Sequence, residues 1–463
     1  MNRSAITVGI YSVSSQSGMT YFADLIERGY NVVGYARRSE HGAAVVSEIN
    51  RTGGVWVERP GNQNDEASRF VPLRTSTATH DVKVLVDSSD IIIVAIPAHF
   101  HQTVAFDLAE HGLKGKRIPI VLSPSRTLAV PYIWNVLGEG HPVVSFATSP
   151  YSCKMLGTNS VYLKRRKRTW LASLEGRFST SVTQVVRELF PQAALSTIPA
   201  LTSLTNIGAV FHPAAFLLNV SEITNRANAG KPFSFYVEGI HKRPEVAGVI
   251  EDIDQVRLAI AKRIGLNVFG LRSEPRDDVW RKLTNGLRAL EDEHEDDIDV
   301  LRETRAKFTE YLDRSVLSAQ HWLDMTYGVE RREGETLGDA IGRTPTYQDR
   351  SFPQSRYIEE DVPTGLVPFE AMARRLDIDC SVITDIIDQC IGRYRTDWRK
   401  LGRNLAEFTD EYLLAHLRGE AGRTTECGSR SLSSSTTADG GRARAVAVPK
   451  GELPNPEHVK RGR

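Results

Sequence analysis

The chain has 463 residues, of which 41% are hydrophobic and 25% are charged, and its formal net charge is +1. This length suits two domains that each bury a sizeable core. The near-zero charge argues against a dedicated nucleic-acid-binding protein, so partners must be inferred from local sites.

Cysteine usage and the N-terminus indicate the compartment. The chain has four cysteines and no CxxC pair, which predicts neither a zinc ribbon nor a disulfide framework and fits a reducing compartment. The first residues lack a signal-peptide profile, and we find no apolar run long enough to span a bilayer. We therefore expect a cytoplasmic protein without membrane contact.

The first part of the chain alternates β-branched segments with helical periodicity. A helix is expected over 18–29, and strands are expected over 5–12, 31–38, 91–96, 117–125 and 142–150. Buried strands separated by helices imply a parallel sheet with right-handed crossovers. Residues 1–199 are therefore predicted to form a Rossmann-like α/β domain.

From about residue 200 the pattern becomes helical. Apolar residues recur at intervals of three and four along 250–264, and further helices are expected over 297–327 and 367–398. Residues 200–419 are therefore predicted to form a mostly α-helical second domain. The remainder, 420–463, is rich in Gly, Ser, Thr and Arg, cannot offset its chain entropy and is predicted to be disordered.

The strand, turn and helix at the N-terminus predict a pyrophosphate site. The usual GxGxxG fingerprint is incomplete, because Gly18 occupies its last position but Val13 and Ser15 occupy the first two. The small side chains of Ser14 and Ser15 would still let a phosphate approach, whereas Val13 is unfavourable at a tight turn. An α/β domain that binds no nucleotide is the alternative.

The end of the second strand indicates which cofactor binds. A domain that prefers NAD usually places an acid there to bond the ribose hydroxyls. This chain has Arg37, Arg38 and Ser39, which suit the 2′-phosphate of NADP. The sequence therefore favours NADP over NAD, and two exposed loop arginines are the alternative interpretation.

The stretch "NIGAVFHPAAFLLN" (206–219) places His212 before Pro213 in an apolar run. Proline favours the first helical position, which predicts that His212 lies at the N-terminal boundary of a helix. A positive helix end and apolar surroundings both disfavour the imidazolium, so this histidine could exchange a proton near neutral pH. A purely structural histidine is the alternative.

A second motif, "RYIEEDVPTGLVPFEAMARRLDI" (356–378), joins Arg356 to three consecutive acids. The acids precede the apolar segment "GLVP", which is expected to be buried. One acid is therefore expected to point inward and orient a histidine, while Arg356 holds a carboxylate.

Behind a Rossmann-like half, these two motifs in this order resemble the octopine/nopaline dehydrogenase family, the opine dehydrogenases, over most of the chain. That family couples the amine of an amino acid to a 2-oxo acid and reduces the imine with NADPH or NADH. The resemblance implies that His212 is the catalytic acid/base and Asp361 its orienting partner. It also implies that Arg356 and Asn206 contact the substrate, although the family often has a second asparagine where this chain has Gly208.

A narrower resemblance is to the branch that makes opine-type metallophores, the staphylopine- and pseudopaline-like dehydrogenases. It rests on "SFATSPYSCK" (145–154), on the basic segment after it, and on "KPFSFYVEGI" (231–240). In that branch the amine is a larger aminocarboxylate intermediate, and Lys154 is a candidate carboxylate contact. The branch often carries an acid near Ser152, which this chain lacks.

Three other signals have simpler interpretations. The basic run 164–168 is expected to be an exposed strand or turn rather than a nucleic-acid site. The acidic run 291–300 lacks EF-hand spacing, so we expect a solvated surface and no metal. His99 and His101 follow a buried strand at the edge where cofactors bind. A plain loop role is expected for them, and lining of the nicotinamide pocket is the alternative.

The sequence therefore predicts an NADP-preferring opine dehydrogenase that acts on a small-molecule amine and a 2-oxo acid. A role in metallophore biosynthesis and a homodimer are part of this expectation. Two alternatives stay open: a non-catalytic Rossmann-type nucleotide-binding or regulatory protein, and a dehydrogenase of simple 2-hydroxy acids.

Overall fold

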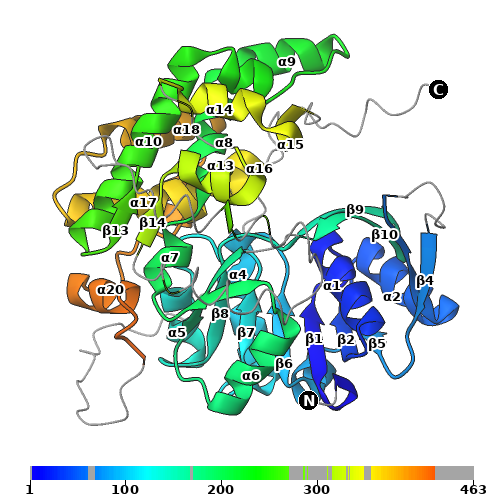
Figure 1. Cartoon of the computed structure of the whole chain (residues 1–463). Helices are drawn as coiled ribbons and strands as arrows, with labels where there is room; N and C mark the ends of the chain where they lie inside the picture. Colours follow the sequence, from blue (N-terminus) through cyan, green and yellow to red (C-terminus); the bar gives the residue numbers. More distant parts are fainter. Residues whose placement is uncertain are drawn as a thin grey trace.

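The structure is a computed structural model with an α/β domain below a helical domain in the view of Figure 1. The described residues are 3–60, 68–166, 170–270, 315–329, 334–348 and 356–422, with single positions 285, 286, 289, 310 and 332. The acidic run 291–300 and most of the predicted tail, residues 423–463, lie outside them.

An eight-stranded sheet forms the centre of the first domain. In spatial order its strands are β12 (Ala193–Ser196), β11 (Trp170–Glu175), β8 (Val143–Phe146), β7 (Ile120–Leu122), β6 (Ile91–Val94), β1 (Thr7–Tyr11), β2 (Asn31–Tyr35) and β5 (Thr77–Thr79). Neighbouring strands are parallel except β8 and β11, which are antiparallel. The predicted Rossmann-like α/β fold is confirmed, with β11 and β12 reversed relative to the other six strands.

Helices cover both faces of this sheet, and alternate side chains of a strand enter different cores. In β6, Ile91 and Ile93 belong to the core under α1, α2 and α6, whereas Ile92 and Val94 belong to the core under α3, α4 and α5. Burial on both faces explains why β6 is apolar throughout. The six helices span Gln16–Glu27 (α1), Glu40–Thr52 (α2), Val82–Ser88 (α3), His101–Leu108 (α4), Val130–Leu137 (α5) and Thr180–Leu189 (α6).

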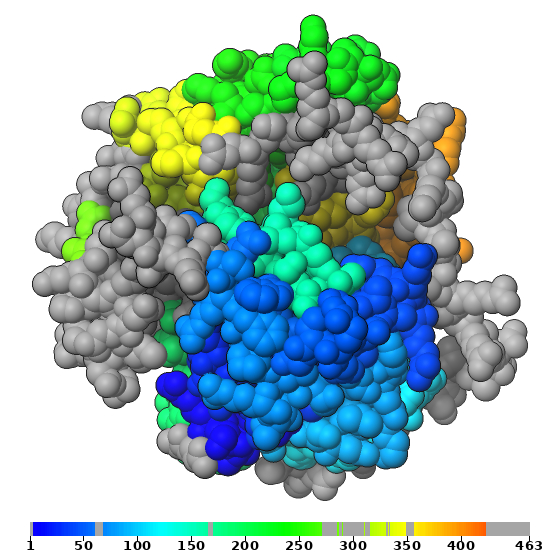
Figure 2. All heavy atoms as spheres, turned by 90° about the vertical axis from the view of Figure 1, so that its right-hand side faces the viewer, coloured from blue at the N-terminus to red at the C-terminus, as the bar shows by residue number. Residues whose placement is uncertain are grey.

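A second sheet, which the sequence did not predict, lies beside α1. Its order is β4 (Ser68–Pro72), β3 (Gly54–Glu58), β10 (Ser160–Arg166) and β9 (Tyr151–Gly157). The described part of the basic run 164–168 therefore lies in a strand. Figure 2 shows the teal residues of this region projecting from the blue first domain toward the helical domain.

The helices of the second domain enclose one continuous apolar core. They are α7 (Pro199–Ser203), α8 (Ile207–Leu218), α9 (Val220–Asn228), α10 (Pro244–Arg263), α13 (Ala319–Tyr327), α14 (Leu337–Arg343), α15 (Pro345–Gln348), α16 (Arg356–Glu359), α17 (Val367–Arg375), α18 (Ser381–Tyr394), α19 (Trp398–Leu401) and α20 (Asp410–Leu417), with the π-helical segments Val237–His241 (η4) and Val362–Leu366 (η5) and the strand pair β13 (Asn267–Phe269) and β14 (Ser315–Leu317). One stretch of the described residues, Pro199–Leu218, is long and apolar enough to cross a membrane, contrary to the sequence-based expectation, but its apolar window is 83% buried.

Arg403 of the helical domain holds two loops of the first domain through hydrogen bonds. The buried Arg403 guanidinium donates to the carbonyl oxygens of Ala98, Ser125 and Thr127 at 2.7–3.1 Å. Burial lowers the pKa of Arg403 to about 10, so it stays charged at neutral pH. Because these carbonyls follow β6 and β7, Arg403 fixes the strand ends that border the site described next.

Candidate active site

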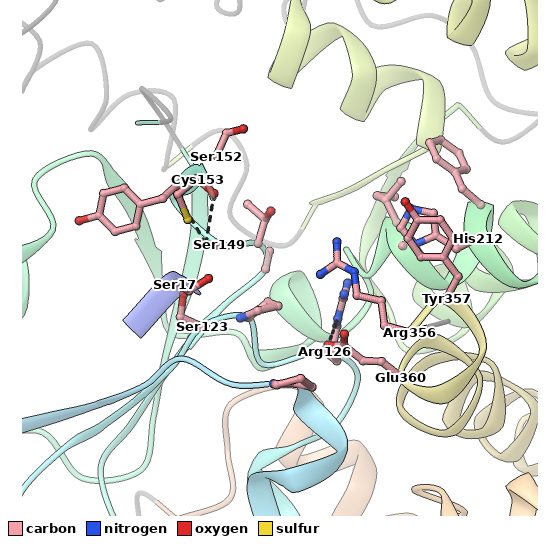
Figure 3. Close-up of a pocket in the computed structure, with 18 of the residues that line it drawn as sticks. Ser17, Ser123, Arg126, Ser149, Ser152, Cys153, His212, Arg356, Tyr357 and Glu360 are labelled. Atoms are coloured by element: carbon pink, nitrogen blue, oxygen red, sulfur yellow. Dashed lines mark hydrogen bonds and ion pairs between the residues drawn. The ribbon is translucent and has the colours of Figure 1, made fainter. Parts of the chain in front are cut away.

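One cavity of about 680 Å³ connects the two domains (Figure 3). Its lining begins with Ser15, Gln16 and Ser17 at the start of α1 and reaches His212 and Arg356 on the helical side. In this fold, ligands bind in the crevice beyond the carboxyl ends of the parallel strands, which is where the cavity lies.

The turn between β1 and α1 does not require glycine at the first two positions of the GxGxxG fingerprint. Ser12 adopts the left-handed conformation (φ 75°), so the buried Val13 need not, and the Val13 N–H donates to the Tyr35 carbonyl at 2.7 Å. Gly18 is required, because a Cβ there would lie 2.0 Å from the Ser12 carbonyl oxygen. Ser15 caps α1 by accepting from the Gly18 N–H at 2.9 Å. The close strand–helix packing that dinucleotide binding needs is therefore present.

A second cavity, of about 450 Å³, lies at the carboxyl end of β2. It is lined by Tyr35, Arg37, Arg38, His80, Asp81, Val82, Asp107 and His111. Ser14 and Ser39, also predicted to bind cofactor, line neither cavity; Ser39 instead caps α2 by accepting from the Gly42 N–H at 3.0 Å. With the N-terminus of α1 at one cavity and two arginines at the other, the residues present fit a dinucleotide.

His212 lies inside α8, so the prediction that it begins a helix is wrong. The helix starts at Ile207 and contains Pro213. Proline costs a helix interior one backbone hydrogen bond, but nine of the twelve residues of α8 are buried, and this packing keeps the helix continuous. The positive helix end therefore does not control the proton of His212.

The predicted contact between His212 and Asp361 is present. His212 Nδ1 lies 2.7 Å from Asp361 Oδ2, and His212 Nε2 lies 3.0 Å from the Tyr236 hydroxyl. The imidazole also stacks on Tyr357, with ring centroids 4.0 Å apart. A carboxylate only accepts, so Nδ1 carries a proton and, in the neutral ring, Nε2 accepts from Tyr236. Burial lowers the pKa of His212 below its usual value, although Asp361 opposes this shift.

Arg126, for which the sequence predicted no role, joins the polar groups around Asp361. Its guanidinium lies 3.3 Å from Asp361 Oδ1 and 3.1 Å from Glu360 Oε1, and it donates to Asn206 Oδ1 at 3.1 Å. Burial would raise the pKa of Asp361, but Arg126 and His212 outweigh it and lower that pKa. Asp361 is therefore a carboxylate at neutral pH.

The position of Arg126 also explains the glycine at 208. A Cβ on Gly208 would lie 2.8 Å from Arg126 Nη1 and 3.1 Å from Asp361 Oδ1, so the guanidinium occupies the space that a larger side chain would need. Arg126 follows β7 at the carboxyl edge of the sheet, where this fold binds ligands. The position of Arg126 directly after a predicted strand was the signal in the sequence that could have identified it as a site residue.

Arg356 points into the cavity beside Arg126 (Figure 3). Over the described residues, no carboxylate forms an ion pair with Arg356. Its guanidinium is therefore available for a carboxylate of the substrate, whereas Arg126 is already shared between Glu360 and Asp361.

Two other predicted substrate ligands lie outside the cavity lining. Asn206 is 1% exposed, accepts from Arg126 and donates to Thr127 Oγ1 at 3.2 Å, so it holds Arg126 in place. Lys154 is exposed on β9, while the preceding Ser152 and Cys153 line the cavity.

The histidines after β6 also lie outside the lining, although the preceding Ile96 and Pro97 belong to it. His101 is 2% exposed, and its Nδ1 lies 3.5 Å from Arg403. Within the described ranges, no group of three His, Cys, Asp or Glu side chains is arranged to hold a metal ion.

Comparison with known proteins places this site in a family. The family model "NAD/NADP octopine/nopaline dehydrogenase, alpha-helical domain" matches residues 200–391. An opine dehydrogenase of Arthrobacter sp. (strain 1C) is 25% identical over 396 residues, covering 84% of this chain and 91% of that protein. The chain matches the octopine/nopaline dehydrogenase family through its helical domain and is similar to an opine dehydrogenase over most of its length. It is accordingly an NAD(P)-dependent oxidoreductase that acts on CH–NH bonds.

Solved structures share the fold of this chain. An octopine dehydrogenase in complex with NADH and agmatine matches with a TM-score of 0.63 and 16% identity, covering 91% of this chain and 100% of that one. A yersinopine dehydrogenase bound to NADP+ matches with a TM-score of 0.55 and 14% identity, covering 91% and 99%. The Rossmann-like domain followed by a helical domain is therefore common to all three.

Proposed function

We propose that the chain catalyses the NADPH-dependent reductive condensation of an amine with a small 2-oxo acid. The observation that carries this proposal is the content of one cavity. His212, held by the ionised Asp361, shares that cavity with the N-terminal turn of α1 and with Arg356, which forms an ion pair with no described carboxylate. This arrangement supports a site that combines an acid/base, a ligand for a carboxylate and a dinucleotide site.

The condensation needs one group that both gives and takes a proton. The amine adds to the 2-oxo carbon to form a carbinolamine, whose hydroxyl is protonated and leaves as water to give the imine. His212 supplies and recovers protons at Nε2, while Asp361 at Nδ1 stabilises the imidazolium. When bound, NADPH supplies the hydride that reduces the imine carbon.

Arg356 is assigned to the carboxylate of the 2-oxo acid. A guanidinium binds a carboxylate through two parallel hydrogen bonds and so fixes the position of the neighbouring carbonyl carbon. Arg356 lines the same cavity as His212, and the charge of Arg126 is already balanced by Glu360 and Asp361.

The preference for NADPH is inferred from the cavity at the end of β2. Arg37 and Arg38 both line it, and guanidinium groups bind the 2′-phosphate that distinguishes NADPH from NADH. Asp107, an acid in the same lining, accepts a hydrogen bond from the Tyr11 hydroxyl at 2.5 Å.

An opine-type metallophore precursor is a narrower candidate for the amine, supported by the resemblance of residues 145–154 and 231–240. In that case Lys154 would hold an additional carboxylate, yet Lys154 is exposed and absent from the cavity lining. The site therefore supports a smaller amine better.

The test pairs amines with 2-oxo acids and measures loss of NADPH absorbance and the mass of the product. The expected product is a secondary amine that joins both substrates. Replacing His212 by Gln should lower kcat by about 10²-fold or more with NADPH binding unchanged. His241→Gln, outside both cavities, is the matched control and should behave as wild type.

Two results would contradict the proposal. Reduction of a 2-oxo acid without any amine would indicate a 2-hydroxy-acid dehydrogenase. NADPH binding without turnover of any pair would indicate a binding or regulatory protein.

A further inference from the structure

Part of the cavity lining next to His212 is aromatic. Four rings that line it contact one another in sequence: Tyr236 stacks on Tyr347 with centroids 3.9 Å apart, Tyr347 meets Tyr327 edge-on at 5.5 Å, and Tyr327 meets Trp322 edge-on at 5.7 Å. We call these four residues the aromatic wall. It begins at Tyr236, whose hydroxyl contacts His212 Nε2, and continues through the ring contacts to Trp322.

Both domains hold this wall in place. Trp322 lies on α13, which is capped by the Ser318 hydroxyl and ends at Gly328 in the left-handed conformation. Its side chain packs against the helical core and also against a small cluster that includes Leu171 of the first domain. Tyr347 is 3% exposed on α15. The wall is therefore a preformed surface of the cavity.

The charges of the cavity lie elsewhere. Its described lining contains two arginines, Arg126 and Arg356, and one acid, Glu360. Glu360 is paired with Arg126 at 3.1 Å. A cationic side chain bound at the aromatic wall would gain contact with the ring faces but would find no unpaired carboxylate among the described lining residues to balance its charge. An apolar side chain has no charge to desolvate, and its transfer from water to the rings is favourable.

We propose that the aromatic wall binds the side chain of the amine substrate, and that this substrate is an amino acid with an aromatic or large aliphatic side chain. The inference rests on the proposed function and adds the substrate class to it. The turn of α1 takes the cofactor, Arg356 takes the 2-oxo acid, and the amine nitrogen must approach His212. The side chain of the amino acid then contacts Tyr236 and the other rings of the aromatic wall.

The experiment compares L-phenylalanine, L-leucine, L-arginine and L-aspartate as amines, each with pyruvate and NADPH. We expect kcat/KM for phenylalanine and leucine to exceed that for arginine and aspartate by about tenfold or more. Trp322→Ala should raise KM for phenylalanine about tenfold, with KM for pyruvate and NADPH unchanged. Trp56→Ala, a tryptophan 43% exposed on β3, is the matched control and should leave all three unchanged.

A second variant at the same position keeps the test decisive if truncation unfolds the protein. Trp322→Glu places a carboxylate at the wall and should shift the preference from phenylalanine toward arginine. A wild-type preference for arginine or aspartate, or equal effects of Trp322→Glu on all four amines, would overturn the inference.

A binding measurement separates this inference from the proposed function. Saturation-transfer NMR with NADP+ and pyruvate present reports whether the phenylalanine ring protons contact the protein. Ring contact that Trp322→Ala abolishes, without turnover of any amine, would leave the aromatic wall as the binding surface while refuting the dehydrogenase. Turnover of phenylalanine, together with ring contact that is undiminished in Trp322→Ala, would support the dehydrogenase and refute the aromatic wall as the binding surface.

Discussion

Replacing Asp361 by Asn should remove most of the turnover and leave the fold intact. Asp361 is 1% exposed, and its carboxylate accepts from His212 Nδ1 at 2.7 Å. The substituted amide has nearly the same shape but no charge, and one of its two terminal atoms donates instead of accepting. Because the Arg126 guanidinium lies 3.3 Å from Asp361 Oδ1, the amide oxygen should face Arg126 and the amide NH2 should face His212 Nδ1. In that orientation it would stabilise neither the imidazolium nor the Nδ1-protonated ring.

The expected loss follows from the strength of this contact. A hydrogen bond between charged groups contributes about 1.5–3 kcal/mol, which corresponds to roughly a 10- to 150-fold decrease in kcat. Asp361 also raises the pKa of His212, so its removal lowers that pKa further. The arm of the kcat–pH profile that needs protonated His212 should therefore move to lower pH.

Steady-state NADPH oxidation over a range of pH measures both effects, and a fluorescence titration measures cofactor affinity. Glu360→Gln is the matched control, because Glu360 shares Arg126 but accepts from the Ala98 N–H at 3.2 Å and not from His212. It should lose much less turnover. A folded Asp361→Asn variant that keeps kcat within about threefold of wild type would refute the role of this carboxylate.

Four further outcomes are expected. Arg356→Ala should raise KM for the 2-oxo acid by about 10²-fold, from loss of a charge-assisted contact, with KM for NADPH unchanged; equal effects on both KM values would count against the assignment. Arg37→Ala should weaken NADPH about tenfold but not NADH in paired binding titrations, and an equal loss for both cofactors would contradict a 2′-phosphate contact. Gly208→Ala should lower kcat about tenfold by displacing Arg126, even though alanine favours a helix by about 1 kcal/mol; unchanged kcat would show that the guanidinium relaxes without cost. Burial lowers the pKa of His141 to about 4, so the free energy of unfolding should fall as pH decreases from about 6.5 to that value, by ~3 kcal/mol in urea titrations, and His141→Gln should remove this part of the pH dependence.

Local signals in the sequence predicted most elements that border the site. The continuous apolar run 91–94 forms β6 because both faces of the sheet are covered. The serine-rich turn was an ambiguous cofactor signal, and the structure resolves why it is compatible: Ser12 adopts the left-handed conformation while Gly18 keeps the one close approach that excludes a Cβ.

The place of His212 within its helix was mispredicted for a physical reason. Proline is most favourable at a helix start, but that preference is smaller than the stabilisation from burying both flanks of α8. Lys154 shows a similar limit, because the tertiary structure, rather than residue chemistry, determines that β9 borders the cavity at Ser152 and Cys153 and not at Lys154.

By itself the sequence predicted the two-domain order, and its resemblance to the octopine/nopaline dehydrogenases implied the pairing of His212 with Asp361, because the chemistry of that family requires these residue types in two recognisable motifs. Only the tertiary structure decided that Arg126 joins them and that four aromatic rings line the same cavity. These groups come from separate segments, and their neighbours depend on how two cores pack against each other, which no local pattern encodes.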